Sequence, residues 1–417
     1  MSISPISSTM RLREVNGAWW LATPGGELIV SLGLNQVEAP RLLAPACRRH
    51  TLKRYGDDFA GADGAWNPAG EGVRRWLACV RRDFRQWGFN AFGYHTVAPR
   101  SLLGGEFHYL CRIWPGPLGG AGPEPVYPDV FAPEFAAALE GRLAALCADL
   151  SRDAACLGYA FADQPPWQEP APGPGLHPWV RQLAEAPEPS AGKRAWLGLL
   201  QANHGGAAAA AAAHGLGARV WEELAANRDW SRSPGDPAAA AADNQAMLGL
   251  VAARWYRLHA RILRQTDPGR LILGDKLRWG SGGLPDYLLP ILAEFTDLLC
   301  LECDGDIAGR IESLHRLHRR TGLPVLLVAA PGAAGDQRKL GQDYADNLRA
   351  AMTAGVVVGW HHSGYLDAAE SARPGGGLFD LFGNPRAEAL AWFGVANRHA
   401  EVWHARPAPQ PPENSRR

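Results

Sequence analysis

Residues 133–167 read PEFAAALEGRLAALCADLSRDAACLGYAFADQPPW, and this stretch decides the fold. Its first part, 133–153, spaces its apolar residues as a helix does. The apolar run 156–163 that follows is short and contains aromatic residues, which predicts a buried strand. The strand ends in Asp163 and Gln164, with two prolines and Trp167 just beyond. A helix leading into a buried strand with polar groups at its carboxyl end is one unit of an α/β protein.

The same unit recurs along the chain in both directions. Strands are predicted over 27–35, 89–96, 156–163, 270–275, 297–304, 323–330 and 356–365. Helices are predicted over 70–88, 133–153, 245–268, 310–322, 342–355 and 385–405. This alternation requires a parallel sheet covered by helices. No G-x-G-x-x-G or G-x-x-x-x-G-K-[ST] motif follows any of the strands, which disfavours the nucleotide-binding sheets. A single α/β domain, the (β/α)8 TIM barrel, fits the 417 residues best.

The barrel is expected to span residues 14–405, after an N-terminal tail over 1–13 and before a disordered tail over 406–417. Residues 165–240 are irregular and too long for a bare connection. We therefore expect a long loop excursion after the fourth strand, lying over the site face and carrying short helices.

The composition excludes several classes of partner. Lys+Arg and Asp+Glu both number 42, so no basic face is expected for nucleic acid or an anionic membrane. The seven cysteines are scattered, and Cys300 and Cys303 are interpreted as small residues of a buried strand rather than metal ligands. The sequence shows neither a signal peptide nor a transmembrane run, so a cytoplasmic protein is expected. We predict no cofactor and no metal; the oligomeric state stays open.

Polar and aromatic residues gather at the carboxyl ends of the predicted strands, where a TIM barrel carries its site. They are Asn35, Tyr94, His95, Asp163, Gln164, Asp275, Lys276, Glu302, Asp304, Trp360, His361 and His362. Carboxylates and aromatic rings that converge on one opening suit a polyhydroxylated ligand, so a carbohydrate or sugar-like molecule is the expected partner.

Several blocks resemble bacterial β-agarase-like enzymes and related retaining glycoside hydrolases of the (β/α)8 superfamily. The blocks are NGAWWLATPGGELIVSLGLN (16–35), QWGFNAFG (86–93), YPDVFAPEFAAAL (127–139), LGYAFADQPPW (157–167), DPGRLILGD (267–275) and GLFDLFGNP (377–385). The blocks follow one another in the order of that family, and the resemblance covers roughly residues 14–395. The resemblance implies a TIM barrel that acts on, or binds, carbohydrate.

The chain departs from this family at the residues that the family uses for catalysis. The family's middle strand ends in Asp-Asn-Glu, whose glutamate is the general acid/base; here Ala162-Asp163-Gln164 stands in its place. An amide cannot donate and recover a proton. The family's nucleophilic glutamate corresponds to Ala329, or to Val328 if the register slips by one. On the last strand, an aromatic platform is replaced by His361-His362-Ser363.

Three hypotheses follow from these departures. The first is a barrel that binds carbohydrate without retaining double-displacement hydrolysis. The second is an enzyme that uses displaced carboxylates, Asp163 with Glu302 or Asp304, and histidines for proton transfer. The third is a metal-dependent hydrolase using His95, His361 and His362, which is disfavoured because adjacent histidines on a strand point apart.

The residues are assigned to two groups. The catalytic candidates are Asp163, Glu302, Asp304 and His361. The ligand-binding candidates are Asn35, Tyr94, His95, Gln164, Trp167, Asp275, Trp360 and His362. Because adjacent strand residues face opposite sides, Asp163 is not expected simply to replace Gln164, whereas Glu302 and Asp304 are expected to share a face.

Overall fold

The computed structural model describes residues 9–408 except 117, 119, 121–124, 151–152, 168–174, 281–282, 330–335 and 368–376. Eight strands close into a barrel in the order β10-β11-β4-β5-β6-β7-β8-β9. The barrel strands are β4 (Ser31–Leu34), β5 (Ala91–Phe92), β6 (His108–Arg112), β7 (Cys156–Asp163), β8 (Leu271–Trp279), β9 (Leu299–Cys303), β10 (Val325–Ala329) and β11 (Val357–His362). All neighbouring strands are parallel. The predicted TIM barrel is confirmed.

A second, antiparallel sheet covers the amino ends of the barrel strands. It consists of β1 (Arg11–Val15), β2 (Ala18–Ala22) and β3 (Leu28–Ile29), and β3 leads directly into β4. Met10 and Leu21 pack with the apolar side chains that fill the barrel interior, among them Leu157 and Val358. Because β1 begins at Arg11, this sheet includes residues that were expected to form an N-terminal tail.

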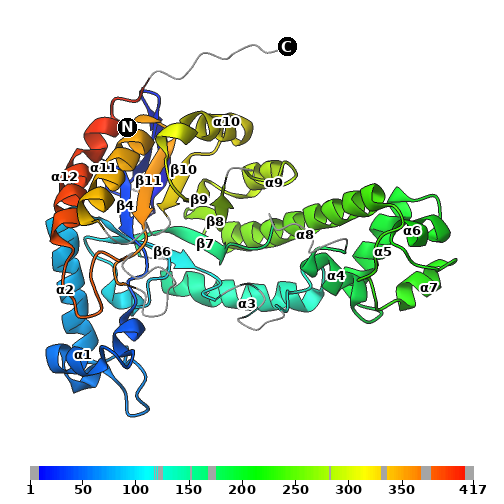
Figure 1. Ribbon diagram of the computed structural model, residues 1–417, viewed down its shortest axis with the longest axis horizontal. Helices are drawn as coiled ribbons and strands as arrows, with labels where there is room; N and C mark the ends of the chain where they lie inside the picture. The colour runs from blue at the N-terminus through cyan, green and yellow to red at the C-terminus, as the bar shows by residue number, and fades with distance from the viewer. Residues whose placement is uncertain are drawn as a thin grey trace, which may run out of the picture.

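Amphipathic helices surround the barrel (Figure 1). They are α1 (Arg48–Tyr55), α2 (Glu71–Trp87), α3 (Pro133–Leu150), α8 (Pro237–Thr266), α9 (Leu288–Phe295), α10 (Ile311–Thr321), α11 (Gln337–Thr353) and α12 (Ala387–His404). Helix α2 shows why they form. Val73, Trp76, Leu77, Val80 and Phe84 recur at helical spacing and are all buried, and Gly88 ends the helix in the left-handed conformation. No helix within the described ranges is long and apolar enough to cross a membrane.

The third barrel strand, β6, was not predicted. It is five residues long, HYLCR, and pairs with β5 and β7. The connection from β5 to β6, described throughout, contains the 3-10 helix η3 (Arg100–Leu102) in place of an α-helix. Without the expected helix between two strands, the alternating pattern gave no signal for β6.

The chain after β7 forms an arm that projects from the barrel (Figure 1). It contains α4 (Pro178–Glu185), α5 (Ala191–Asn203), α6 (Ala207–Ala213), α7 (Trp221–Ala226) and the first half of α8. Helix α8 has 30 residues, so it is about 45 Å long. The excursion was expected over the site face, whereas α5, α6 and α7 lie at the end of α8 that is far from the strands.

Candidate functional site

Lys276, in the carboxyl half of β8, lies at the centre of an ionic network with residues at the carboxyl ends of β7 and β9. Its Nζ is 2.8 Å from Asp163 Oδ1 and 2.6 Å from Glu302 Oε2. The two carboxylate oxygens are therefore separated by no more than the sum of these distances. Asp163 also pairs with His95, whose Nε2 is 2.6 Å from Oδ2, and Gln164 Nε2 donates to Glu302 Oε1. We call these five residues the Lys276 cluster.

The strand register brings Lys276 to this position. It stands beside Asp163 of β7 and Cys300 of β9 in the parallel ladder. Just before it, Gly274 has a φ of +67°, and a Cβ at this position would meet Thr296 Cγ2 at 2.8 Å. The left-handed glycine accompanies a shift in the β7–β8 register.

Asp163 is held as a carboxylate. Burial alone would raise its pKa, but the hydrogen bonds and charges of His95 and Lys276 outweigh burial and lower the pKa to about 2. A group with this pKa is ionised at neutral pH and cannot act there as a general acid.

Gln164 joins the same network as Asp163 although the two are neighbours in sequence. Its φ is +46°, outside the extended region, because the strand ends at Asp163. His95 and Gln36, which follow β5 and β4, are also left-handed, with φ of +57° each. Non-glycine residues in this region cost roughly 1 kcal/mol or more each and cluster at functional sites.

Arg112 and Tyr94 extend the cluster. The Arg112 guanidinium lies 3.4 Å from His95 Nδ1 and donates to the Pro115 carbonyl at 3.0 Å. Burial lowers the pKa of Arg112, while the charge of Asp163 opposes this. Lys276 Nζ lies 5.4 Å from the centroid of the Tyr94 ring, within cation–π range. The face thus offers guanidinium, imidazole and amide groups to a ligand.

Asp275 and Trp167 were predicted to bind ligand, but they are bonded to each other in a buried location. Trp167 Nε1 donates to Asp275 Oδ2 at 3.0 Å, and the Ala162 amide donates to Oδ1 at 2.9 Å. Burial raises the pKa of Asp275 to about 6 although these donors favour its charged form. The Trp167 ring stacks on Trp179, with centroids 5.0 Å apart. Their burial argues for a structural role that holds the excursion to β8.

His361 and Asn35 are also buried and belong to the barrel wall. His361 Nε2 lies 2.8 Å from Ser31 Oγ, and burial lowers the pKa of His361 to about 3. Asn35 Oδ1 accepts from the Tyr94 amide, and Nδ2 donates to Ser363 Oγ, both at 2.8 Å. An imidazole with this pKa is neutral at pH 7, which argues against the proton transfer that was expected of His361.

Trp360 and His362 point to the outer side of the barrel. His362 packs edge-on against Tyr344 of α11 and Phe393 of α12, and burial lowers its pKa to about 4. Both line a cavity of about 600 Å³ between the ends of β9 to β11 and α11, together with Ala329. Asp304 follows β9 and is exposed. The structure therefore separates Trp360 and His362 from the Lys276 cluster, and no contact of Asp304 with that cluster is seen among the described residues.

Of the twelve predicted site residues, the Lys276 cluster brings together His95, Asp163, Gln164 and Glu302. The sequence placed Lys276 at a strand end but gave it no role, and it gave Arg112 none because β6 was not recognised. A lysine next to an aspartate at a strand end was the available signal for Lys276.

A metal-ligating group occurs elsewhere. Within the described ranges, one group of His, Cys, Asp and Glu side chains is close enough to share an ion: His204, His214 and Asp243. It lies in the arm. His361 and His362, by contrast, face opposite sides of β11, which removes the structural basis for the metal-dependent barrel hypothesis. All seven cysteines are free, and burial raises the pKa of Cys300 and Cys303 to about 12.

No protein family model matches this chain, and no match is found among the curated proteins. Solved structures do match. PfGH50B aligns with a TM-score of 0.73 at 13% identity, covering 97% of this chain and 67% of that one. An exo-beta-agarase aligns with a TM-score of 0.72 at 15% identity, covering 96% and 66%. A GH2 beta-galacturonidase from Eisenbergiella tayi aligns with a TM-score of 0.53 at 9% identity, covering 94% and 53%.

These matches support a glycoside-hydrolase-like fold, as the sequence blocks predicted. The chain spans about two thirds of the length of the first two proteins. At these identities the likeness extends to the fold alone, so the roles of individual residues rest on the geometry of the Lys276 cluster.

Proposed function

We propose that the face around the Lys276 cluster binds a carbohydrate or sugar-like ligand without retaining double-displacement hydrolysis. The observation that carries this proposal is the ammonium of Lys276 between Asp163 and Glu302. Its single positive charge is shared by the carboxylates of Asp163 and Glu302, beside the position where the family places its acid/base.

Retaining hydrolysis needs a carboxyl group that is protonated before the leaving group departs. Asp163 is ionised, with a pKa of about 2, and Gln164 cannot carry out this proton transfer. Asp275 has a raised pKa of about 6, but it is buried and its oxygen atoms are bonded to Trp167 and to the backbone of Ala162. None of these three groups supplies a general acid facing a ligand.

The ligand class is supported by the surface and by the neighbours. Arg112, His95 and Gln164 are nitrogen donors at partly exposed positions, which suits hydroxyl-rich molecules. The matched structures include an exo-beta-agarase and a beta-galacturonidase. We therefore select agar-derived oligosaccharides as the first probes and galacturonate-containing ones as the second.

A second function is favoured by one observation. The Asp163 and Glu302 oxygen atoms that contact Lys276 are 2.8 and 2.6 Å from its Nζ. This geometry is compatible with the separation of about 5–5.5 Å that retaining enzymes use. If a ligand displaced Lys276, the pair would be available for glycoside cleavage by displaced carboxylates.

Calorimetric titration and turnover assays on the same oligosaccharides and on aryl glycosides separate the two functions. We expect the oligosaccharides to bind without being hydrolysed, and to bind more weakly to Gln164→Ala and Arg112→Ala. Glu302→Gln is compared with Glu312→Gln, a matched change at an exposed glutamate of α10. Turnover that Asp163→Asn or Glu302→Gln abolishes, and Glu312→Gln does not, would establish the enzyme instead.

A further inference from the structure

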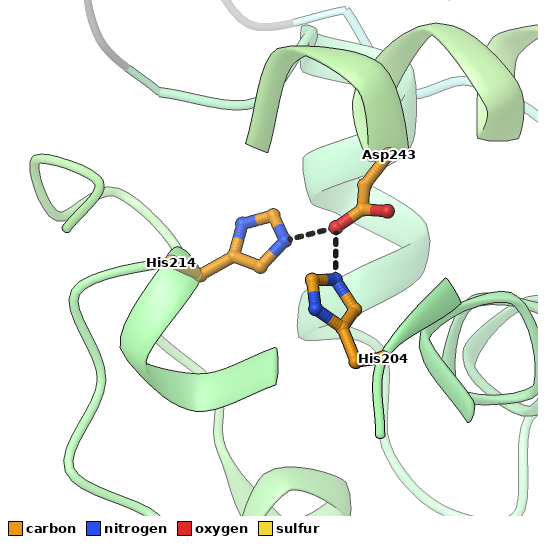
Figure 2. Close-up of side chains that lie close together, drawn as sticks. All are labelled: His204, His214 and Asp243. Carbon is orange, nitrogen blue, oxygen red and sulfur yellow. Dashed lines mark hydrogen bonds and ion pairs between the residues drawn. The ribbon is translucent and has the colours of Figure 1, made fainter. Parts of the chain in front are cut away.

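Two histidines and one aspartate converge in the arm, remote from the Lys276 cluster (Figures 1 and 2). His204 follows α5, His214 follows α6, and Asp243 lies in the second turn of α8. The ligating atoms that they offer all lie within 4.8 Å of one another. Three separate helical segments therefore contribute one ligand each.

Both imidazoles turn their Nε2 atoms toward the same carboxylate oxygen. His204 Nε2 is 2.7 Å and His214 Nε2 is 3.0 Å from Asp243 Oδ2. The other oxygen, Oδ1, accepts a hydrogen bond of 2.8 Å from Asn203 Nδ2. Asn203 thus orients the carboxylate and leaves Oδ2 directed at the histidines, as outer partners of metal ligands do.

The surroundings favour a cation between these three atoms. The side chain of Asp243 is 3% exposed, and its ion pairs in the described part of the chain are with imidazoles alone. The His214 ring is held edge-on by Trp196 and Trp230, each at 5.4 Å between centroids. His204 is partly exposed, which provides a path for an ion to enter.

A metal ion would also strengthen the packing of α6 against its neighbours in the arm. Helix α6 consists of seven alanines, Ala207–Ala213, so it contributes only methyl groups to the packing against α5 and α8. A bound metal ion is one way to reinforce a segment whose own side chains bury little apolar area. An ion held by His204, His214 and Asp243 would join α5, α6 and α8 directly.

We propose that His204 Nε2, His214 Nε2 and Asp243 Oδ2 bind a divalent transition-metal ion of the zinc class. Two imidazole nitrogens and one carboxylate oxygen form a common zinc ligand set, which leaves a fourth position for water. Ligands at about 2.0–2.1 Å from a tetrahedral ion are about 3.3 Å apart. The nitrogen–oxygen distances of 2.7 and 3.0 Å would lengthen by a few tenths of an ångström to hold the ion, and the partial exposure of His204 permits this movement.

Zinc titration of the tag-free full-length chain against a chromophoric chelator tests the proposal. We expect about one bound equivalent, with strong loss of affinity in His214→Ala and Asp243→Asn. Asn203→Ala, which alters only the positioning residue, is expected to weaken binding by about 10–100-fold. The matched control is His399→Ala on α12, where the exposed imidazole contacts its own helix at Val395.

Cobalt substitution gives a second readout, because a four-coordinate nitrogen and oxygen site gives visible absorption that the ligand variants lose. The proposal is overturned if the wild-type chain does not compete with the chelator, or if folded His214→Ala and Asp243→Asn bind zinc as the wild type does. Circular dichroism establishes their folding. Should either variant unfold, X-ray absorption of the wild-type zinc complex decides: two imidazoles support the site, and sulfur ligands contradict it.

Discussion

Asp163 in the barrel and Asp243 in the arm have similar pKa values but different partners. In both, burial would raise the pKa, and hydrogen-bond donors lower it to about 2. Asp163 has Lys276, a cation that is part of the chain, as well as His95. Asp243 has two imidazoles and the amide of Asn203. The barrel therefore supplies the positive charge beside its carboxylate, whereas the arm leaves room for a cation from outside.

The largest effect is expected from removing the barrel's own cation. Lys276→Met leaves Asp163 and Glu302 close together without their shared partner, and loss of one member of a buried ion pair costs about 3 kcal/mol. The free energy of unfolding, measured by urea denaturation, is expected to fall by this amount at pH 7 and by less at pH 4, where the carboxylates take up protons.

The control for this change is Lys339→Met. Lys339 forms an exposed pair with Asp343 on α11, so little change is expected. If the two lysine variants lost the same free energy of unfolding, the ion pairs of Lys276 would contribute no more to stability than a surface pair.

The second largest effect is expected in Asp163→Asn, which changes how the free energy of unfolding depends on pH. The pKa of Asp163 is lowered on folding, so its contribution is present above about pH 4 and is lost as the pH falls toward 2. The contribution is on the order of 2 kcal/mol. Urea denaturation between pH 2 and 7 checks this, and Asp163→Asn is expected to flatten the acid side of the profile.

Asp243→Asn is expected to flatten the profile in the same range, because the direction of the shift is the same. Asp275 provides the contrast. Its pKa is raised to about 6, so it contributes an opposite slope between about pH 4 and 6. If the fall of unfolding free energy below about pH 4 were the same in Asp163→Asn as in the wild type, Asp163 would not be stabilised as a carboxylate by the Lys276 cluster.

A third carboxylate, Asp275, sharpens the comparison because neutral donors hold it. Trp167→Phe removes the indole N–H that donates to Oδ2 and keeps most of the ring. Leaving one buried acceptor without this donor is expected to cost about 2 kcal/mol, measured by thermal and urea unfolding. Trp179→Phe, whose N–H donates to the Pro128 carbonyl instead, tests whether the loss is specific to the carboxylate.

The smallest effect is expected from removing zinc. At free zinc ten times its Kd, the bound ion adds about 1.4 kcal/mol to stability. Chelation is expected to speed amide hydrogen exchange in α5, α6 and the first turns of α8, and to leave β7 to β9 unchanged. If chelation sped amide hydrogen exchange equally in β7 to β9, the zinc would not act on the arm alone.

The barrel was predictable from the sequence because short apolar strands alternate with helices whose apolar residues recur every three to four positions. The prediction failed locally at β6, where η3 replaces the helix that would have marked the strand. The end of β7 was located correctly at Asp163, whereas β8 continues to Trp279, beyond the predicted end at 275. The rule that neighbours face opposite sides does not hold past a strand end. Gln164 is left-handed, so both it and Asp163 enter one network through Lys276 and Glu302.

The arm cluster was not predictable because its members lie on three helical segments. His204 follows α5, His214 follows the all-alanine helix α6, and Asp243 is one polar residue in the alanine-rich start of α8. No spacing rule relates residues that only tertiary packing brings together. The same holds for Asp275 and Trp167: the sequence predicted Asp275 at the end of one strand and Trp167 just after another. The structure places Asp275 inside β8, and only packing shows that the two side chains bond to each other.

Helix α8 connects the arm to the barrel as one continuous, rigid element. It runs without interruption from the metal-ligating end of the arm to Thr266, and β8, which carries Lys276, begins at Leu271. The half of α8 that projects is about 22 Å long, so a tilt of about 5° displaces its far end by about 2 Å. The angle at which α8 leaves the barrel thus sets the reach of the arm, and small-angle scattering would register a change in that angle as a change in the longest dimension of the particle.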